Sequence, residues 1–325
     1  MIKPLRFGEI YKTKIWGGTG IGRLKGLEDN GNTGESFEIS GLAGDETRVK
    51  TGEFEGLTLR ELLERFGARL VGARNFERFG TNFPLLVKFI SAAGDLSLQV
   101  HPDDAMAHEM GHPYGKNEMW FIVAAEPGAH ICAGFSSDFS ETQYLAALAD
   151  GNLGDHVNVA VTHPGDCFYI PAGCIHAIGA GNLIIEIQQS SDDTFRVYDY
   201  DRVDADGKKR ELHVEQARRA LDYRAAAPRE AHYDRQAEGA TRLVDCASFS
   251  TRSCRFTQPA TLDYAAIDSF VIFVAYEGAA LLTDAEGNEV RLKAGESVLF
   301  PAENTAVSVK PLGDTPCRFL EARIG

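Results

Sequence analysis

The chain has 325 residues, a formal net charge of −14 at pH 7 and a hydrophobic content of 44%. This length exceeds the usual size of one domain, so we expect two modules. The acidic balance argues against nonspecific binding to nucleic acid or to an anionic membrane. The longest apolar runs, such as residues 270–276, are far too short to span a bilayer.

The N-terminus and the cysteines indicate the cellular location. Residues 1–6 lack the apolar core of a signal peptide. The six cysteines show no Cys-x-x-Cys spacing, which favours free thiols over disulfides or a zinc–thiolate site. We therefore expect a cytoplasmic protein, and the sequence is compatible with either a monomer or a homodimer.

The predicted elements begin with short strands in the first 55 residues, separated by glycines and charged turns. A helix is expected at 57–66, because apolar residues recur at helical spacing and Thr58 can serve as its N-cap. Residues 83–90, 96–101 and 117–123 predict strands. The sequence therefore indicates a largely β structure in this part of the chain.

Beyond residue 130 the pattern predicts helices at 140–149 and 213–223. Between them, residues 158–190 are predicted to form mainly strands. A polar connector follows at 224–239, and short alternating strands occupy the rest. We expect a catalytic module at 1–235 and a smaller β module at 236–325.

Four side chains form a candidate metal site. Gln99 and His101 are two residues apart in an alternating segment, so they project from one face of a strand. Glu118 opens another strand-like run, where a buried carboxylate needs a partner such as a metal. With His176, they supply two imidazoles, a carboxylate and an amide oxygen, which suit a divalent metal of intermediate hardness.

The spacing around His176 is the most specific signal in the chain. Gly165 is followed after five residues by Pro171, then by Gly173, and His176 comes three residues later. Gly165 permits a left-handed backbone conformation, and Pro171 with Gly173 predicts a tight reversal before the next strand. This pattern resembles the second motif of the cupin family, whose metal-ligand histidine follows such a turn. The resemblance implies a mainly β fold, a jelly-roll barrel with helical insertions.

Several further segments resemble the type I mannose-6-phosphate isomerases, in their short bacterial form. They occur in the family's order along residues 10–205, as the runs Lys14–Gly18, Gly34–Ser40, Leu96–Asp104, Lys116–Trp120 and Asp192–Arg202. The resemblance implies interconversion of mannose 6-phosphate and fructose 6-phosphate through a cis-enediol. It also implies one Zn²⁺ per chain, although this ligand set suits Fe, Mn or Co as well.

The same resemblance assigns roles to cationic residues near the predicted ligands. Arg196 matches the family's catalytic arginine, and Lys116 is implied to lie in the active site, where it can assist proton movement. Lys88 and Arg202 are candidates for binding the substrate. Because a sugar phosphate is anionic, these four cations should give a local positive potential within an acidic protein.

The glycine-to-proline spacing of the cupin-like turn occurs a second time in the C-terminal region. Gly295 and Pro301 repeat the spacing of Gly165 and Pro171, which predicts a second, degenerate cupin-like domain; the alternative is an unrelated β-sandwich cap. This region contains no histidine, because the last one is His232, so we expect it to lack metal ligands.

Two other functions remain open. A metal-dependent cupin oxygenase would share the fold and the ligands but has no need of the phosphate-binding cations. A noncatalytic sugar-phosphate-binding cupin would bind its ligand without turnover. An anaerobic assay separates the first from an isomerase, and the absence of turnover identifies the second.

Overall fold

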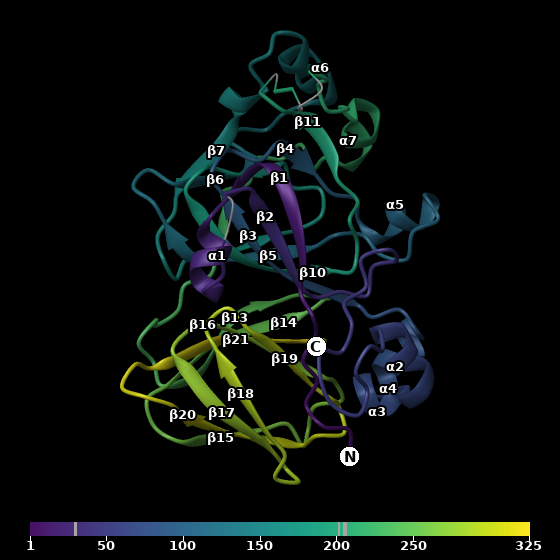
Figure 1. The fold of residues 1–325 in the computed structure, drawn as a ribbon. Helices are drawn as coiled ribbons and strands as arrows, with labels where there is room; N and C mark the ends of the chain where they lie inside the picture. Colours follow the sequence, from purple (N-terminus) through teal and green to yellow (C-terminus); the bar gives the residue numbers. More distant parts are fainter. Residues whose placement is uncertain (29–30, 201, 204–206) are drawn as a thin grey trace.

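The computed structural model describes residues 1–28, 31–200, 202–203 and 207–325. It is built mainly of antiparallel strands, arranged as two pairs of sheets (Figure 1). The first pair contains the strands β1 to β12 and the second pair contains β13 to β21. The expected mainly β architecture is confirmed, but the described strands form open sheets rather than a closed barrel.

The first pair of sheets holds the strands on which the predicted site residues lie. The seven-stranded sheet has the order β1 (Ile10–Gly18), β2 (Thr33–Ile39), β3 (Leu85–Ala92), β10 (Asn182–Gln189), β5 (Glu118–Ala125), β8 (Cys167–Ile170) and β12 (Arg229–Glu230). The five-stranded sheet has the order β11 (Phe195–Tyr198), β4 (Leu98–Val100), β9 (His176–Ile178), β6 (His130–Phe135) and β7 (Val157–Val161).

A core cluster packs between these two sheets. It joins Trp120 and Phe168 of the seven-stranded sheet to Ile131 and Ile178 of the five-stranded sheet, and all four are almost fully buried. Burial of such large apolar side chains contributes roughly 1.5–3 kcal/mol each, so the two sheets are held face to face.

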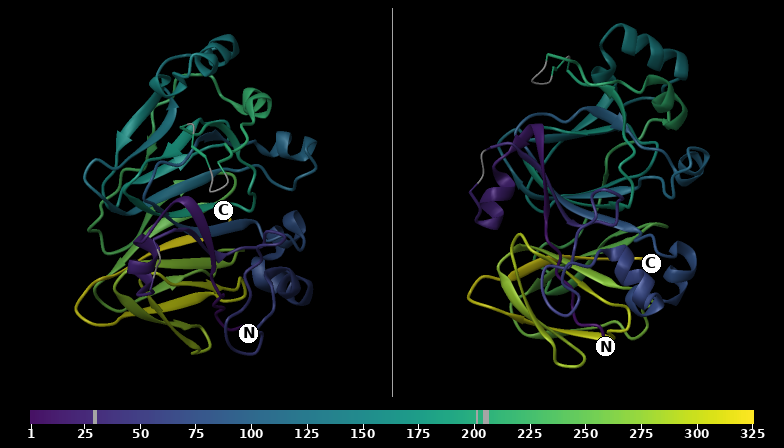
Figure 2. Two further views of the ribbon diagram at one scale, coloured as in Figure 1. Left: turned by 45° about the horizontal axis from the view of Figure 1, so that its top comes forward. Right: turned by 45° about the vertical axis from the view of Figure 1, so that its right-hand side comes forward.

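The second pair of sheets follows residue 238. One sheet has the order β13 (Gly239–Asp245), β14 (Ser250–Phe256), β21 (Cys317–Arg323), β16 (Val271–Glu277) and β19 (Ser297–Phe300). The other has the order β15 (Ala260–Asp263), β20 (Ala306–Pro311), β17 (Ala279–Asp284) and β18 (Glu289–Lys293). Figure 2 shows the two pairs stacked one on the other, and a core cluster that includes Phe89 and Ile272 joins them.

The helices lie outside the sheets as insertions. They are α1 (Gly20–Lys25), α2 (Leu59–Phe66), α3 (Ala68–Val71), α4 (Ala73–Phe79), α5 (Asp104–Glu109), α6 (Glu141–Ala149), the 3₁₀ helix η1 (Leu153–His156) and α7 (Val214–Ala220). Thr58 caps α2 through a reciprocal capping box with Glu61, as expected. None of the helices in the described ranges is long and apolar enough to cross a membrane.

The predicted glycine-proline turn is present in both sheet pairs. Gly165 has a φ of +89° before β8, and Gly173 has a φ of +82° before β9. Gly295, with a φ of +83°, precedes β19 in the same way. These positive φ values disfavour any residue with a Cβ, so the turn that carries His176 depends on glycine.

Candidate metal centre and active-site cavity

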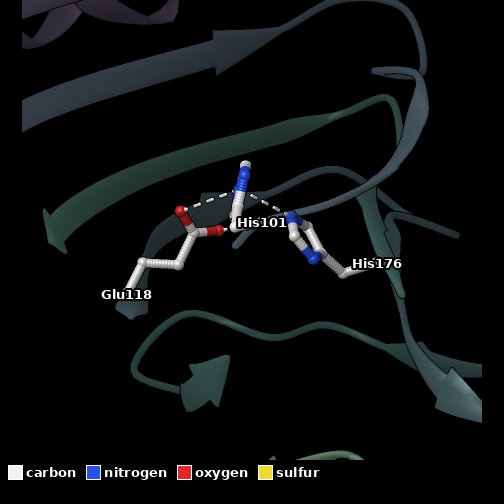
Figure 3. Close-up of side chains that lie close together, drawn as sticks. All are labelled: His101, Glu118 and His176. Atoms are coloured by element: carbon white, nitrogen blue, oxygen red, sulfur yellow. Dashed lines mark hydrogen bonds and ion pairs between the residues drawn. The ribbon is translucent and has the colours of Figure 1, made fainter. Parts of the chain in front are cut away.

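Three strands bring the predicted metal ligands together. Gln99 lies on β4 and faces His176, the first residue of β9, in the strand register. His101 follows β4 directly, and Glu118 is the first residue of β5. Figure 3 shows the side chains of His101, Glu118 and His176 pointing toward one another.

The ligand atoms are close enough to share one ion. His101 Nε2 lies 3.4 Å from Glu118 Oε2, and His176 Nε2 lies 3.4 Å from Glu118 Oε1. The two Nε2 atoms are 3.1 Å apart. Tetrahedral zinc with bonds of about 2.0–2.1 Å places neighbouring ligand atoms about 3.3–3.4 Å apart. The spacing of the three side chains therefore fits such an ion.

Hydrogen bonds from the outer ring nitrogens orient both imidazoles. His101 Nδ1 donates to the carbonyl oxygen of Asp193 (2.7 Å), and His176 Nδ1 donates to that of Cys174 (2.8 Å). Each neutral ring then turns the lone pair of its Nε2 toward the other ring. Both carboxylate oxygens of Glu118 are buried without a hydrogen bond, and the Lys116 ammonium lies 3.3 Å from Oε2. The acceptors that face one another form a buried group that can hold a metal ion.

Electrostatics keep the three groups in the protonation states that a metal requires. Burial, together with the nearby ammonium of Lys116, lowers the pKa of His101 to about 3. Burial also lowers the pKa of His176. Burial opposes the ionisation of Glu118, but neighbouring groups, Lys116 first, hold its pKa well below the usual range. At neutral pH the site offers two neutral imidazoles and one carboxylate.

Gln99 contacts this cluster through its amide group. Its Nε2 lies 3.3 Å from His176 Nε2, and its Oε1 lies 3.4 Å from Ser97 Oγ. A half-turn of the amide exchanges these two atoms and would present the oxygen to the cluster.

A cavity of about 410 Å³ lies against the cluster, bordered by Gln99, Lys116 and Trp120. The described residues that line it include six cations and four carboxylates. The cations are Lys12, Lys14, Lys88, Lys116, Arg196 and Arg210, and the carboxylates are Glu35, Asp45, Glu186 and Asp192. This excess of positive charge agrees with the cationic patch expected for an anionic ligand.

A row of alternating charges crosses the cavity wall from β1 to β10. Lys14 Nζ lies 2.8 Å from Glu35 Oε2, and Lys88 Nζ lies 3.0 Å from both Glu35 Oε1 and Glu186 Oε1. Glu186 also accepts a hydrogen bond from Trp120 Nε1 (3.0 Å). Because Lys88 is buried between two carboxylates, its ammonium is held in place, and they raise its pKa despite the burial.

Two cations lie at the end of the cavity beside the candidate metal ligands. Lys116 Nζ is 3.3 Å from Glu118 Oε2. Arg196 lies opposite Gln99 in the register of β11 with β4. Its Nε donates to Ser97 Oγ (3.3 Å), and its Nη1 donates to the carbonyl oxygen of Glu211 (2.9 Å). The structure thus brings Arg196 and Lys116 to the same end of the cavity as the group of His101, Glu118 and His176.

Arg202 does not reach the cavity wall in the described structure. Its guanidinium donates to Asp199 and to the carbonyl oxygen of Asp95, so its predicted role in substrate binding stays a prediction. Arg210 pairs with the same Asp199 (Nε to Oδ2, 2.7 Å) and lines the cavity instead.

Other cavity residues were missed by the sequence analysis. Lys12 and Lys14 alternate with exposed residues and precede the buried Trp16 on β1. This period-two pattern places all three side chains on one face, and it was readable from the sequence. Glu186 and Arg210 carried no comparable signal.

The chain is similar in sequence to known proteins. Residues 5–130 match the family described as phosphomannose isomerase type I, catalytic domain. The mannose-6-phosphate isomerase ManA of Bacillus subtilis is 34% identical over 303 residues, which cover 92% of this chain and 93% of that protein. The chain belongs to the type I phosphomannose isomerase family.

Further relatives agree with this membership in the type I phosphomannose isomerase family. A mannose-6-phosphate isomerase of Streptococcus mutans is 39% identical over 222 residues, or 67% of each chain. The crystal structure of the mannose 6-phosphate isomerase from Bacillus subtilis superimposes with a TM-score of 0.85 at 31% identity, over 99% of both chains. The family resemblance expected from the sequence is thereby confirmed.

Proposed function

We propose that this chain interconverts mannose 6-phosphate and fructose 6-phosphate at the cavity beside the metal cluster. The observation that carries the proposal is the buried group of His101, Glu118 and His176, whose acceptor atoms face one another at 3.1–3.4 Å. This group adjoins a cavity with more cations than carboxylates. Membership in the type I phosphomannose isomerase family supports the same reaction.

We infer one zinc ion per chain, held by the imidazoles of His101 and His176, by the carboxylate of Glu118 and by the amide oxygen of Gln99. When bound, such an ion acts as a Lewis acid on a sugar oxygen. The chain itself fixes the ligands, because backbone carbonyls hold both imidazole rings and the strand register holds Gln99 beside His176.

The reaction moves a proton between C1 and C2 of the sugar, and this leaves negative charge on an enediolate. A fixed cation near the reacting carbons lowers the barrier by stabilising that charge. We assign this role to Arg196, whose guanidinium is oriented by Ser97 and by the carbonyl of Glu211 and has no carboxylate partner among the described residues. We assign proton movement between the sugar oxygens to Lys116, beside Glu118.

A carboxylate in the cavity can serve the transfer of the carbon-bound proton. Burial and the charge of Glu118 raise the pKa of Glu186, although Lys88 opposes the shift. Because a raised carboxyl pKa lies closer to neutral pH, Glu186 suits a group that both takes and returns a proton. We therefore infer that Glu186 takes part in proton transfer, and that Lys88 fixes its position as well as lining the substrate cavity.

A coupled assay tests the proposed function. The purified chain is given mannose 6-phosphate under air and under nitrogen, with and without a chelator, and fructose 6-phosphate is measured together with metal content. We expect turnover that is indifferent to oxygen, is lost with the chelator and returns with zinc. Oxygen consumption would identify an oxygenase, and binding of the sugar phosphate without turnover would identify a noncatalytic cupin. Either result refutes the proposal.

We also propose that residues 1–235 form the metal-binding catalytic module and that residues 236–325 form a second β module without metal ligands. In support, the strands of each sheet pair come from one side of this boundary. The group of potential ligands found among the described residues also lies in the first part. The cytoplasmic location and the choice between monomer and homodimer remain predictions.

A further inference from the structure

The cavity must hold the phosphate group of the proposed substrate as well as its reacting carbons. Phosphate is carried on C6, at the opposite end of the sugar from the reacting C1 and C2. Lys116 and Arg196 lie at the metal end, beside Glu118 and Gln99. The phosphate must therefore meet a different cation. In the sheet order, β1 is separated from β5 by β2, β3 and β10, although the end of β1 also pairs with β3 at Gly17. Lys14 and Glu118 therefore lie on strands that are not neighbours.

Lys14 of β1 has its side chain on the cavity face and remains accessible. Its side chain is 37% exposed, against 8% for Lys88. Its Nζ pairs with Glu35 Oε2 at 2.8 Å, while the other oxygen of Glu35 pairs with Lys88. The two ammonium groups therefore share Glu35, and the second carboxylate of this row, Glu186, pairs with Lys88.

The Lys14 side chain passes close to the backbone of β2 at Gly34. A Cβ atom at Gly34 would lie 2.5 Å from Lys14 Cγ and 2.9 Å from the ring of Trp16. Real Cβ atoms do not approach other atoms so closely, so glycine at position 34 lets the Lys14 side chain cross β2 toward Glu35. The Lys14 side chain therefore packs closely against β2 at Gly34 while 37% of it remains exposed.

Among the other described cations that line the cavity, Lys12 has Asp45 as a carboxylate partner of its own, whereas Lys14 shares Glu35 with Lys88. Lys88 is buried and already pairs with both Glu35 and Glu186. Arg210 is held by two contacts to Asp199. An ammonium has three donors, and Lys14 uses one of them on Glu35, which leaves donors for a phosphate oxygen.

We propose that Lys14, held beside Lys88 by Glu35, binds the phosphate group of the sugar phosphate and thereby sets the preference for phosphorylated substrates. This inference rests on the proposed isomerase function for the identity of the ligand. Loss of one charge-assisted hydrogen bond weakens binding by about ten- to a hundredfold. Because the phosphate is remote from the reacting carbons, the loss should affect KM far more than kcat.

The test compares the full-length, zinc-loaded variants K14M, K14R, K12M and K50M with the unchanged chain. Lys50 is the matched control, because it pairs with Glu9 at 3.0 Å outside the cavity. Lys12 lies on the same face of β1 and pairs with Asp45. For each variant we would measure KM and kcat for mannose 6-phosphate, and the affinity for inorganic phosphate and fructose 6-phosphate by calorimetry.

For K14M we expect KM to rise at least about tenfold with kcat within about threefold, and phosphate affinity to fall in parallel. K14R should recover part of the loss, and K50M should behave like the unchanged chain. Phosphate affinity within threefold of normal in folded K14M would overturn the proposal. An equal loss of phosphate affinity in K12M would also overturn the proposal, because it would show that phosphate binding depends on the overall charge of the cavity.

The calorimetric arm separates this proposal from the proposed function. If the unchanged chain binds fructose 6-phosphate and inorganic phosphate but does not isomerise, the isomerase assignment fails while the role of Lys14 is still measured. If the chain isomerises normally and K14M does too, only the phosphate assignment fails.

Discussion

Replacing Arg196 with alanine tests the electrostatic part of the proposed mechanism most directly. Within the described cavity lining, Lys12, Lys14, Lys88, Lys116 and Arg210 each pair with a carboxylate. Arg196 instead donates to a hydroxyl and a carbonyl oxygen, so its positive charge remains available to the cavity. Burial and the neighbouring Arg210 lower its pKa, but an arginine stays charged at neutral pH.

The expected magnitude follows from these contacts. Removing one preorganised charge that stabilises a developing anion costs about a hundred- to a thousandfold in kcat. The two hydrogen bonds of Arg196 contribute about 1 kcal/mol each to stability, so the variant should lose about 2 kcal/mol of unfolding free energy. Because Arg196 is not among the proposed metal ligands, the zinc content should remain at one ion per chain.

Steady-state turnover of mannose 6-phosphate, metal analysis and thermal unfolding together check this prediction. Ser97→Ala is the comparison variant, since it removes the bond to Arg196 Nε but keeps the guanidinium. It also removes the contact of Ser97 with Gln99, so its zinc content is measured alongside its turnover. We expect about a three- to tenfold loss in kcat for that variant, the effect of one weak orienting hydrogen bond. Folded, metal-loaded R196A that turns over within threefold of the unchanged chain would refute the assignment and leave Arg196 a structural role.

Three further predictions concern the metal and the buried charges. His101→Ala should lose the zinc, measured by elemental analysis after dialysis, because only one imidazole would remain; full retention would remove this ligand assignment. Lys88→Met should lower the free energy of unfolding, measured in denaturant, by about 3–5 kcal/mol, because it leaves the buried Glu186 without its cation. Adding Glu186→Gln to this variant should restore part of that loss. A double variant that is no more stable than Lys88→Met would contradict the reasoning. Burial opposes the ionisation of Glu35, yet Lys88 and Lys14 lower its pKa from 4.5 to about 2, so its contribution of about 3 kcal/mol is present above pH 4.5 and is lost as the pH falls toward 2. The variant E35Q should flatten the pH dependence of stability in that window, and an unchanged slope would show that other groups cause it.

Much of the local structure was predictable from the sequence. The spacing of Gln99 and His101 places both on one face of a strand, and the glycine-proline turn delivers His176 to the start of the next strand. The helix after Thr58 was predictable from its apolar spacing and its capping residue. Strand faces, turns and helix caps depend on the backbone conformation of a few consecutive residues, so the identities of those residues are enough to predict them.

The composition of the cavity was not predictable in the same way. Asp199 holds two arginines, and nothing in their local sequence indicates that Arg210 lines the cavity while Arg202 does not. Likewise, the sequence placed Lys88 near the site without indicating that Glu35 and Glu186 lie on either side of its ammonium.

The sequence by itself determined the residue types, the strand faces and the turns from which a metal site can be made. Only the tertiary structure decided which of these groups share a space. Pairing between strands far apart in the chain sets Glu118 against His101 and His176, and Lys14 against Glu35 and Lys88. Periodicity fixes the face of a side chain, but its partners depend on strand order and register, which arise from packing over the whole fold.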